Sequence, residues 1–436
     1  MILRYSLPRR AAYWTVDWLK GSPVRRHIRD IRSHIEGGQG SEIAARKGQR
    51  LLEHALATVP YYQQYRGVKR IADLPVLQKP TIIEHSTDFI SQAYAMAELS
   101  PKSTSGSYGT PLTVYHTKDK RRRMQAELIY FSAWTGYRVG DRNMKISVRP
   151  KSPIRLFLQN ETQMDPTYLD EDWFAELRLR LIQGREEIFI SFPHLVAELV
   201  EYCLAHGKTR KNFAMRGVIS AGETLHDATR SRVSAFFGCP MLSRYAAEEL
   251  GVLAQECPEQ QQHHLNTSSY LIEILGRDVD RPVEPGEVGR IVVTDLYSHA
   301  MPLIRYDTGD LASYALTCSC GRPGLILSSL NGRMNEEVSD VEGRRVLDSA
   351  IRLMMSDLAG VRQYQFIQSG KVDYEMRLCT LPSFQGEAIL RKCLLDLLGA
   401  QASLRLVYVD EIPPLPSGKR AYIINTWRSP QRRELA

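Results

Sequence analysis

Residues 217–237 read GVISAGETLHDATRSRVSAFF, and this stretch contains a strand followed by a helix, the pattern from which the fold is predicted. Gly217–Ser220 is a short β-rich run, and Asp227–Phe237 has the apolar spacing of a helix. The same alternation extends over residues 103–240. There the strand-like runs are Met144–Val148 and Glu187–Ser191, and the helical stretches are Lys120–Trp134 and Val196–His206. Strands that alternate with helices indicate a layered α/β sheet.

The flanking segments indicate how the rest of the chain is organised. Residues up to about 100 are predicted to form helices and loops, and residues 264–330 to form strands and turns. Further on, two strands of a hairpin, a helix and another strand are predicted over Arg362–Gln368, Tyr374–Cys379, Gln385–Leu398 and Ser403–Val409. We therefore expect a large layered α/β domain with a β-rich subdomain over residues 1–333, and a small, mobile α+β cap domain over residues 334–436.

Length and composition agree with two domains and limit the function. The chain has 436 residues, of which 43% are hydrophobic and 24% charged, as in soluble globular proteins. The net charge of +8 suits polyanionic substrates. Nucleic-acid binding is not expected, because no aromatic–basic recognition motif accompanies the charge. Neither a signal peptide nor a transmembrane run is evident in the sequence, so the cytoplasm is the expected location.

The basic N-terminal segment carries Tyr13, Trp14 and Trp18 and leaves two interpretations open. Aromatic and basic residues on one helix are typical of a segment that rests on a membrane surface. They also occur in an ordinary amphipathic helix packed on its own domain, and the sequence favours this second interpretation.

Five short motifs follow one another along the chain. They are STSGSYGTP at 103–111, SAGETL at 220–225, YAAEELG at 245–251, MPLIRYDTGD at 301–310 and PSGK at 416–419. The hydroxyls and glycines of the first motif let backbone N–H and side-chain OH groups close around phosphate oxygens. Taken alone, this pattern more often marks a hairpin turn, but its place ahead of the other four motifs favours a phosphate loop.

Together these motifs resemble the series of the adenylate-forming enzymes, over residues 100–421. The phrase MPLIRYDTGD and the Cys-Ser-Cys-Gly-Arg at 318–322 resemble in particular the phenylacetate–CoA ligase branch, which includes CapK-like capsule-biosynthesis proteins. The resemblance implies two steps. A carboxylic acid attacks the α-phosphate of ATP, which gives an acyl-adenylate and pyrophosphate, and a thiol, usually that of CoA, then displaces AMP.

The resemblance also assigns roles to the matching residues. The implied β- and γ-phosphate ligands are Thr104, Ser105, Gly106, Ser107 and Gly109. The implied adenine pocket consists of Ala221, Gly222 and Glu223, with Tyr245 stacked on the base; a lone Tyr after a strand is otherwise a core residue.

The catalytic assignments follow from the remaining motifs. Glu249 is the implied Mg²⁺ ligand, Asp310 the implied ribose acceptor, and Arg333 the implied contact to ribose or phosphate. Lys419 is expected to reach the α-phosphate and the attacking carboxylate. Arg305 and Asp307 are expected to brace their turn.

Three positions depart from the family pattern. Thr110 stands where relatives often have Lys, Ala246 where they have Gly, and Glu248 where they usually have Thr or Ser. A second carboxylate beside a phosphate is repulsive unless a cation offsets it. We therefore expect Glu248 to point away, to change metal binding, or to reduce activity.

Four further residues predict a zinc site. Cys257, His264, Cys318 and Cys320 supply three thiols and one imidazole, a set that forms a closed tetrahedral Zn²⁺ site of the structural kind. The pattern also resembles that of the phenylacetate–CoA ligase branch. The alternative interpretation is that these are free surface cysteines.

Several alternatives remain open at this stage. The acyl group is expected to pass to CoA, or instead to a carrier-protein thiol, an amine or a sugar. A degenerate nucleotide-binding protein is the alternative outside the enzymes. The acid, an aryl or medium-sized one by resemblance, is expected to contact Phe131, Trp134 and residues 191–193. A homodimer is common in this branch, and the oligomeric state stays open.

Overall fold

The computed structural model describes residues 3–37, 40–103, 112–147, 150–166, 170–333, 338–346, 350–351, 354–355, 358–413 and 421–427. The chain divides into two compact units. The first comprises residues 1–308 and 312–329, and the second comprises residues 309–311 and 330–436. The predicted α/β class is confirmed, because helices and a large mixed sheet make up the first unit.

The first hundred residues are helical, as predicted. The helices are α1 (Leu3–Leu19), α2 (Pro23–Gly37), α3 (Gly40–Thr58) and α4 (Lys79–Glu84), and short 3-10 turns lie at Pro60–Tyr65, Ile71–Asp73 and Met96–Glu98. The strands β1 (Ser100–Ser103) and β2 (Thr113–His116) then pair antiparallel. Helix α5 (Lys118–Ser132) starts where the Thr117 side chain accepts a hydrogen bond from the Lys120 backbone N–H, a typical N-cap.

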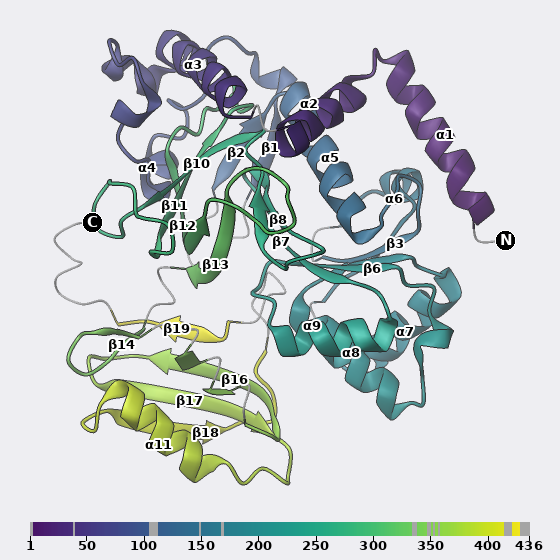
Figure 1. Cartoon of the computed structure of the whole chain (residues 1–436), viewed down its shortest axis with the longest axis vertical. Coiled ribbons are helices and arrows are strands. Elements are labelled where there is room, and N and C mark those ends of the chain that lie inside the picture. Colours follow the sequence, from purple (N-terminus) through teal and green to yellow (C-terminus); the bar gives the residue numbers. More distant parts are fainter. Residues whose placement is uncertain are drawn as a thin grey trace. The chain divides into compact units, whose positions relative to one another are not determined.

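One sheet of eleven strands organises the first unit (Figure 1). Its order is β10-β11-β12-β13-β9-β8-β7-β6-β5-β3-β4. The strands are β3 (Asn143–Ile146), β4 (Glu161–Met164), β5 (Ile188–Ser191), β6 (Gly217–Ala221), β7 (Met241–Ala247), β8 (Gly251–Glu256), β9 (His263–Leu265), β10 (Tyr270–Leu275), β11 (Gly289–Asp295), β12 (Tyr306–Ala315) and β13 (Ile326–Arg333). From β4 to β7 neighbouring strands are parallel, and from β7 to β9 they are antiparallel.

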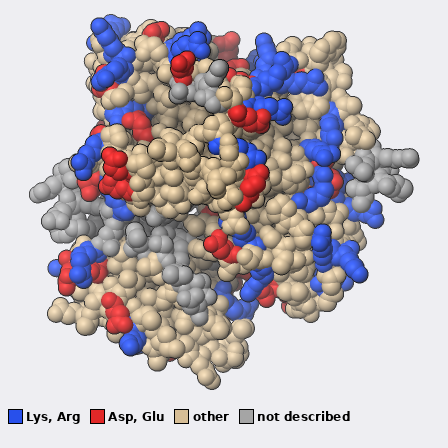
Figure 2. Space-filling view, viewed as in Figure 1, with Lys and Arg blue, Asp and Glu red and all other residues tan. Residues whose placement is uncertain are grey.

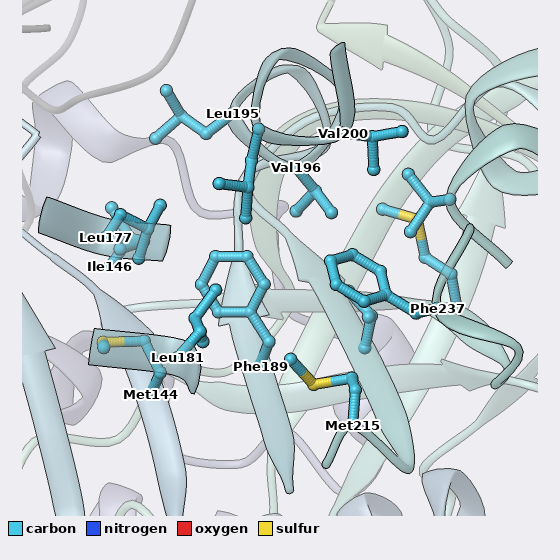
Figure 3. Close-up of a cluster of buried hydrophobic side chains, with 14 of the residues drawn as sticks. Met144, Ile146, Leu177, Leu181, Phe189, Leu195, Val196, Val200, Met215 and Phe237 are labelled. Carbon is cyan, nitrogen blue, oxygen red and sulfur yellow. The ribbon is translucent and has the colours of Figure 1, made fainter. Parts of the chain in front are cut away.

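The parallel half is predicted best by the sequence, because its helices and strands alternate. Helices α6 (Pro153–Gln159), α7 (Glu171–Gly184), α8 (Pro193–Ala205) and α9 (Asp227–Phe237) lie between its strands in the chain. Met144, Ile146 and Phe189 of the sheet pack against Leu177 and Leu181 of α7 in one buried cluster (Figure 3). Successive strand residues point to opposite faces, so one face of the sheet carries this core and the other meets different partners.

The second unit is a small α+β body. Its four-stranded sheet has the order β18-β17-β16-β19, with β16 at Val361–Gln368, β17 at Asp373–Thr380, β18 at Ser403–Tyr408 and β19 at Ile423–Asn425. The short strands β14 (Val338–Ser339) and β15 (Arg345–Val346) pair separately, and helix α11 spans Glu387–Leu398. The predicted hairpin is confirmed, since β16 and β17 are antiparallel.

Two surface properties concern function. In the view of Figure 2, many Lys and Arg side chains lie at the surface with Asp and Glu between them. Among the described residues, no helix combines the length and the apolar character that a bilayer crossing requires.

Candidate active site

The carboxyl ends of the parallel strands bring two predicted motifs to one edge of the sheet. Ser191 at the end of β5 is in register with Ser220 of β6, and Ala221 is in register with Arg244 of β7. Tyr245 follows Arg244 within β7. In open α/β sheets, ligands bind outside the carboxyl ends of the strands.

A positive φ explains the glycine of the SAGETL motif. Gly222 has a φ of 88°, which residues with a Cβ rarely adopt. The chain turns there and leaves β6 before α9 begins at Asp227. The predicted adenine segment is thus a tight turn that begins at a strand end.

Two hydrogen bonds connect the YAAEELG motif to the MPLIRYDTGD motif. Tyr245 is 8% exposed, and its hydroxyl donates to Thr308 Oγ1 over 3.4 Å. The Tyr306 hydroxyl donates to Glu249 Oε1 over 3.0 Å. Asp310 lies further along β12 and is half-buried. Residues about sixty positions apart in the sequence therefore meet at this edge.

The turn that precedes Thr308 is braced as expected. Arg305 forms an ion pair with Glu273 over 3.0 Å and donates to the carbonyl oxygen of Leu74 over 2.6 Å. Asp307 accepts from Arg290 Nη1 over 2.8 Å. All of these groups except Glu273 are at least nine-tenths buried or backbone atoms, so they hold β12 in place.

A buried pair that sequence reasoning missed lies next to the Gly222 turn. His194 Nδ1 lies 2.8 Å from Glu223 Oε2, and their side chains are 3% and 4% exposed. His194 Nε2 has no hydrogen-bond partner among the described residues. Pro193 starts α8 and fixes this approach, but a histidine on the first turn of a helix carries no sequence signal for a partner in another strand loop.

Positive charge surrounds the position of the unusual Glu248. Lys102, at the end of β1, forms an ion pair with Glu248 over 2.9 Å, and the Glu248 side chain is 49% exposed. Burial lowers the pKa of the Lys145 ammonium, and the nearby positive charge of Lys151 lowers it further. The Lys102 ammonium is therefore one cation that offsets the second carboxylate.

Some predicted residues lie outside the described residues or end at their limit. Thr104, Ser105, Gly106, Ser107, Gly109 and Lys419 are outside them. Arg333 is the last residue of β13.

Phe131 and Trp134, which are predicted to contact the acid, both take part in packing contacts, and their contact with the acid stays a prediction. Phe131 is fully buried in a cluster that joins α5 to Val24, Ile31 and Ile35 of α2. Trp134 contacts the His264 ring edge-on, with centroids 5.6 Å apart. Both aromatic residues therefore serve packing.

The four predicted metal ligands converge. Cys257 follows β8, His264 lies on β9, and Cys318 and Cys320 lie in the turn after β12. Their donor atoms all lie within 4.8 Å of one another. The first three side chains belong to buried residues and Cys320 is half-buried, so these are not free surface cysteines.

An arginine organises the surroundings of this cysteine–histidine cluster. Arg322 forms an ion pair with Glu259 over 2.6 Å, and its Nη1 lies 3.6 Å from Cys257 Sγ. Its guanidinium lies over the Trp134 ring, 4.9 Å from the centroid. A positive group beside several sulfur atoms stabilises thiolates.

Known proteins that are similar to this chain agree with the resemblance that its motifs indicate. No family model matches the chain. A phenylacetate–coenzyme A ligase of Thermus thermophilus is 24% identical over 307 residues, which cover 66% of this chain and 69% of the relative. Protein CapK of Staphylococcus aureus is 22% identical over 376 residues, which cover 82% and 81%.

Solved structures show the same fold. A 2-hydroxyisobutyryl-CoA ligase, in the postadenylation state with an acyl-AMP, matches with a TM-score of 0.75 and 16% identity over 92% of this chain and 93% of its own. ATP-bound MatB from Rhodopseudomonas palustris matches with a TM-score of 0.55 and 16% identity over 76% and 68%. The chain therefore has the fold of the adenylate-forming enzymes. Its sequence is similar to the phenylacetate–CoA ligase and CapK branch of that superfamily, as the motifs predicted.

Proposed function

We propose that this protein activates a carboxylic acid with ATP as an acyl-adenylate and passes the acyl group to the thiol of CoA. The observation that carries the proposal is the pair of hydrogen bonds from Tyr245 to Thr308 and from Tyr306 to Glu249. These bonds join two motifs to which the family resemblance assigns nucleotide-binding roles, and they lie at the carboxyl edge of the parallel strands, where ligands bind in open α/β sheets.

Both steps exchange one bond for another. In the first, a carboxylate oxygen of the acid bonds to the α-phosphorus, and the bond from that phosphorus to the bridging oxygen breaks, so pyrophosphate leaves with its electron pair. In the second, the CoA sulfur attacks the acyl carbon, loses its proton, and AMP leaves. Positioning and charge neutralisation supply most of the catalysis in such transfers.

We assign the described residues to parts of the nucleotide as follows. The backbone of Ala221 and Gly222 takes the adenine edge, and Tyr245 stacks on its face. Glu249, with one oxygen already fixed by Tyr306, is the Mg²⁺ ligand. The metal, when bound, neutralises phosphate charge. Glu223 is engaged by His194, so we assign it to shaping the pocket.

Further residues complete the proposal on motif evidence. Thr104, Ser105, Gly106, Ser107 and Gly109 are proposed to hold the β- and γ-phosphates. Asp310 is proposed to accept from the ribose hydroxyls, and Arg333 to contact ribose or phosphate. Lys419 is proposed to stabilise the charge at the α-phosphate during adenylation. Residues 1–333 and 334–436 are proposed as the adenylation domain and the cap.

We also propose that Cys257, His264, Cys318 and Cys320 bind a structural Zn²⁺. With Zn–S distances of about 2.3 Å, tetrahedral ligands stand roughly 3.5–4 Å apart. This spacing fits donor atoms that all lie within 4.8 Å of one another. Four protein ligands leave no open position, so the zinc is assigned to stability: it would fasten the turn after β12 to β8 and β9.

The choice of CoA as acceptor rests on the relatives. The Thermus thermophilus protein is named a coenzyme A ligase, and a 2-hydroxyisobutyryl-CoA ligase structure contains CoA. The name of the CapK relative specifies no acceptor, so a carrier-protein thiol, an amine or a sugar is the alternative acceptor.

An exchange assay tests the first step. The protein is incubated with ATP, Mg²⁺, labelled pyrophosphate and a panel of aryl, hydroxy and medium-chain acids, and label entering ATP is measured. We expect exchange with one class of acid and its loss in Glu249→Gln. Absence of acid-dependent exchange across the panel would support a degenerate binder instead. With the preferred acid, acyl-CoA formation then tests the acceptor, and a product that forms equally well without CoA would refute that part.

A further inference from the structure

Helix α1 packs on the rest of the first unit through Trp14, which contacts a buried apolar cluster, and through several polar side chains. Arg10 donates to the Val139 carbonyl oxygen over 3.1 Å and to Asp141 over 3.3 Å. Asp17 accepts from the Val24 backbone N–H over 2.9 Å and is 5% exposed. Gly140 allows this approach, since a Cβ there would lie 2.7 Å from the Ser6 carbonyl oxygen. The charged side chains of Arg10 and Asp17 are thus engaged within the protein.

Over residues 6–19, the exposed residues of α1 are uncharged. Its exposed residues up to Leu19 are Leu7, Pro8, Ala11, Ala12, Thr15, Val16, Trp18 and Leu19. Trp18 is 65% exposed and Leu19 is 71% exposed. A helix that packs on a soluble protein normally shows the opposite arrangement, with its apolar stripe inward. The amphipathic packing favoured by the sequence holds for Trp14, which packs against the cluster of α2 and α5, whereas Trp18 faces outward.

A second apolar surface adjoins the first. In α6, Ile154, Phe157 and Leu158 are 74%, 67% and 69% exposed. The Arg9 guanidinium lies over the Phe157 ring, 4.5 Å from its centroid, and so ties α6 to α1 (Figure 1). We call the exposed uncharged residues of α1 and α6 the apolar platform. Large contiguous apolar surfaces on soluble proteins mark interaction sites.

Basic side chains predominate around the platform, and the exposed Glu36 at the end of α2 pairs with Arg32. Among residues 6–35, all of which are described, every exposed charged side chain is basic: Lys20, Arg25, Arg26, Arg29 and Arg32. The two acidic residues in this range are engaged inward, because Asp17 is buried and Asp30 pairs with Lys47 and Arg123. Arg155 adds an exposed cation in α6.

We propose that the apolar platform docks on an anionic phospholipid bilayer, with α1 lying in the plane of the interface. Trp and Leu side chains on one face of a helix insert at the boundary of headgroups and acyl chains, and neighbouring Lys and Arg side chains attract anionic headgroups. Arg9 and Arg10 fix α1 to the protein, so the helix lies on the bilayer rather than crossing it.

A second copy of the chain fits the platform less well. A twofold symmetric contact pairs a patch with itself. The basic residues around α1 would then face the same basic residues of the other copy, and like charges in contact are unfavourable. An anionic surface, by contrast, complements both the apolar and the basic groups.

Vesicle flotation with the full-length protein tests the proposal. Vesicles of phosphatidylcholine alone are compared with vesicles that also contain phosphatidylglycerol as a quarter of the lipid, at low and high salt. We expect binding to the anionic vesicles and at least tenfold less to the neutral ones. The pair Trp18→Ser and Leu19→Ser should lower binding at least tenfold, and the pair Arg26→Gln and Arg29→Gln should lower it severalfold at low salt only.

A matched control uses exposed leucines elsewhere in the same unit. Leu179 and Leu204 are 48% and 55% exposed, so Leu179→Ser with Leu204→Ser removes similar apolar surface and should leave binding unchanged. Circular dichroism checks that all variants are folded. The proposal is overturned if no vesicle is bound, or if the control lowers binding as much as the Trp18 pair does. It is also overturned if sedimentation velocity shows that the Trp18 pair separates a dimer while vesicles are not bound.

Discussion

At the carboxyl edge of the parallel strands we propose that the nucleotide binds, and we call this region the nucleotide edge. The nucleotide edge and the cysteine–histidine cluster are both made from residues far apart in sequence, yet their side chains are held in different ways. At the nucleotide edge, Tyr245 and Glu249 are each tied to β12 by one hydrogen bond, and Glu249 remains half-buried. In the cluster, four donor atoms converge within 4.8 Å. The first arrangement suits a ligand that comes and goes. The second favours an ion that stays.

The comparison predicts that substitutions at the nucleotide edge change rates, whereas substitutions in the cluster change stability. Substitutions at single residues test this difference between effects on rate and effects on stability.

Lys419→Ala should have the largest effect on the rate. Removal of one group that stabilises transition-state charge typically costs about 10²–10³-fold in kcat. We expect a loss of this size in pyrophosphate exchange, with an unchanged melting temperature. Lys371→Ala, at another lysine of the same unit, is the control. Similar exchange rates in the two variants would contradict the role of Lys419.

Cys318→Ser should have the largest effect on stability. Loss of one ligand of a closed zinc site removes metal and exposes the remaining thiols, and we expect a loss of roughly 3 kcal/mol or more in unfolding free energy. Elemental analysis should find about one zinc per chain in the wild type and a strongly reduced amount in the variant. Cys393→Ser, at a half-buried cysteine of α11, is the matched control and should retain the metal. A wild-type protein without zinc would show that the cluster has another purpose.

His194→Gln should have an intermediate effect. The buried Glu223 carboxylate loses one 2.8 Å hydrogen bond unless the amide replaces it, and a hydrogen bond to a charged group contributes about 1.5–3 kcal/mol. We expect KM for ATP or for the acid to rise about tenfold, while His206→Gln, on the exposed end of α8, changes neither. An unchanged KM for both substrates in His194→Gln would place the pair outside the site.

Much of the fold could be predicted because the deciding signals are local. Asp227–Phe237 is a helix with the predicted bounds, and the strand predicted at Gly217–Ser220 extends by one residue only. Apolar periodicity and the glycine turn between them depend on neighbours in sequence. The four donors of the cluster were likewise predicted, since their residue types restrict the chemistry they can perform.

Other features depend on partners that are distant in the chain. Strand β8 contains Gln255 and Glu256, which are buried because Arg244 and Arg230 pair with them, and no local pattern predicts this. Phe131 was expected to contact the acid, but it is fully buried where α5 packs on α2. The inward direction of Arg10 in α1 likewise depends on distant partners, because its side chain donates to the Val139 carbonyl oxygen and to Asp141.

Glu248→Gln should have the smallest effect and gives the sharpest internal test of the nucleotide edge. Its carboxylate is half exposed and pairs with Lys102, and exposed ion pairs contribute about 0–1 kcal/mol. We expect exchange rates within roughly threefold of the wild type and a stronger salt dependence, because the Lys102 charge is released toward the phosphates and salt screens that attraction. The neighbouring substitution Glu249→Gln removes the proposed metal ligand and should abolish most activity at the same Mg²⁺ concentration. If Glu248→Gln were the more damaging of the two, the metal ligand would be Glu248, and the hydrogen bond from Tyr306 to Glu249 would be structural only.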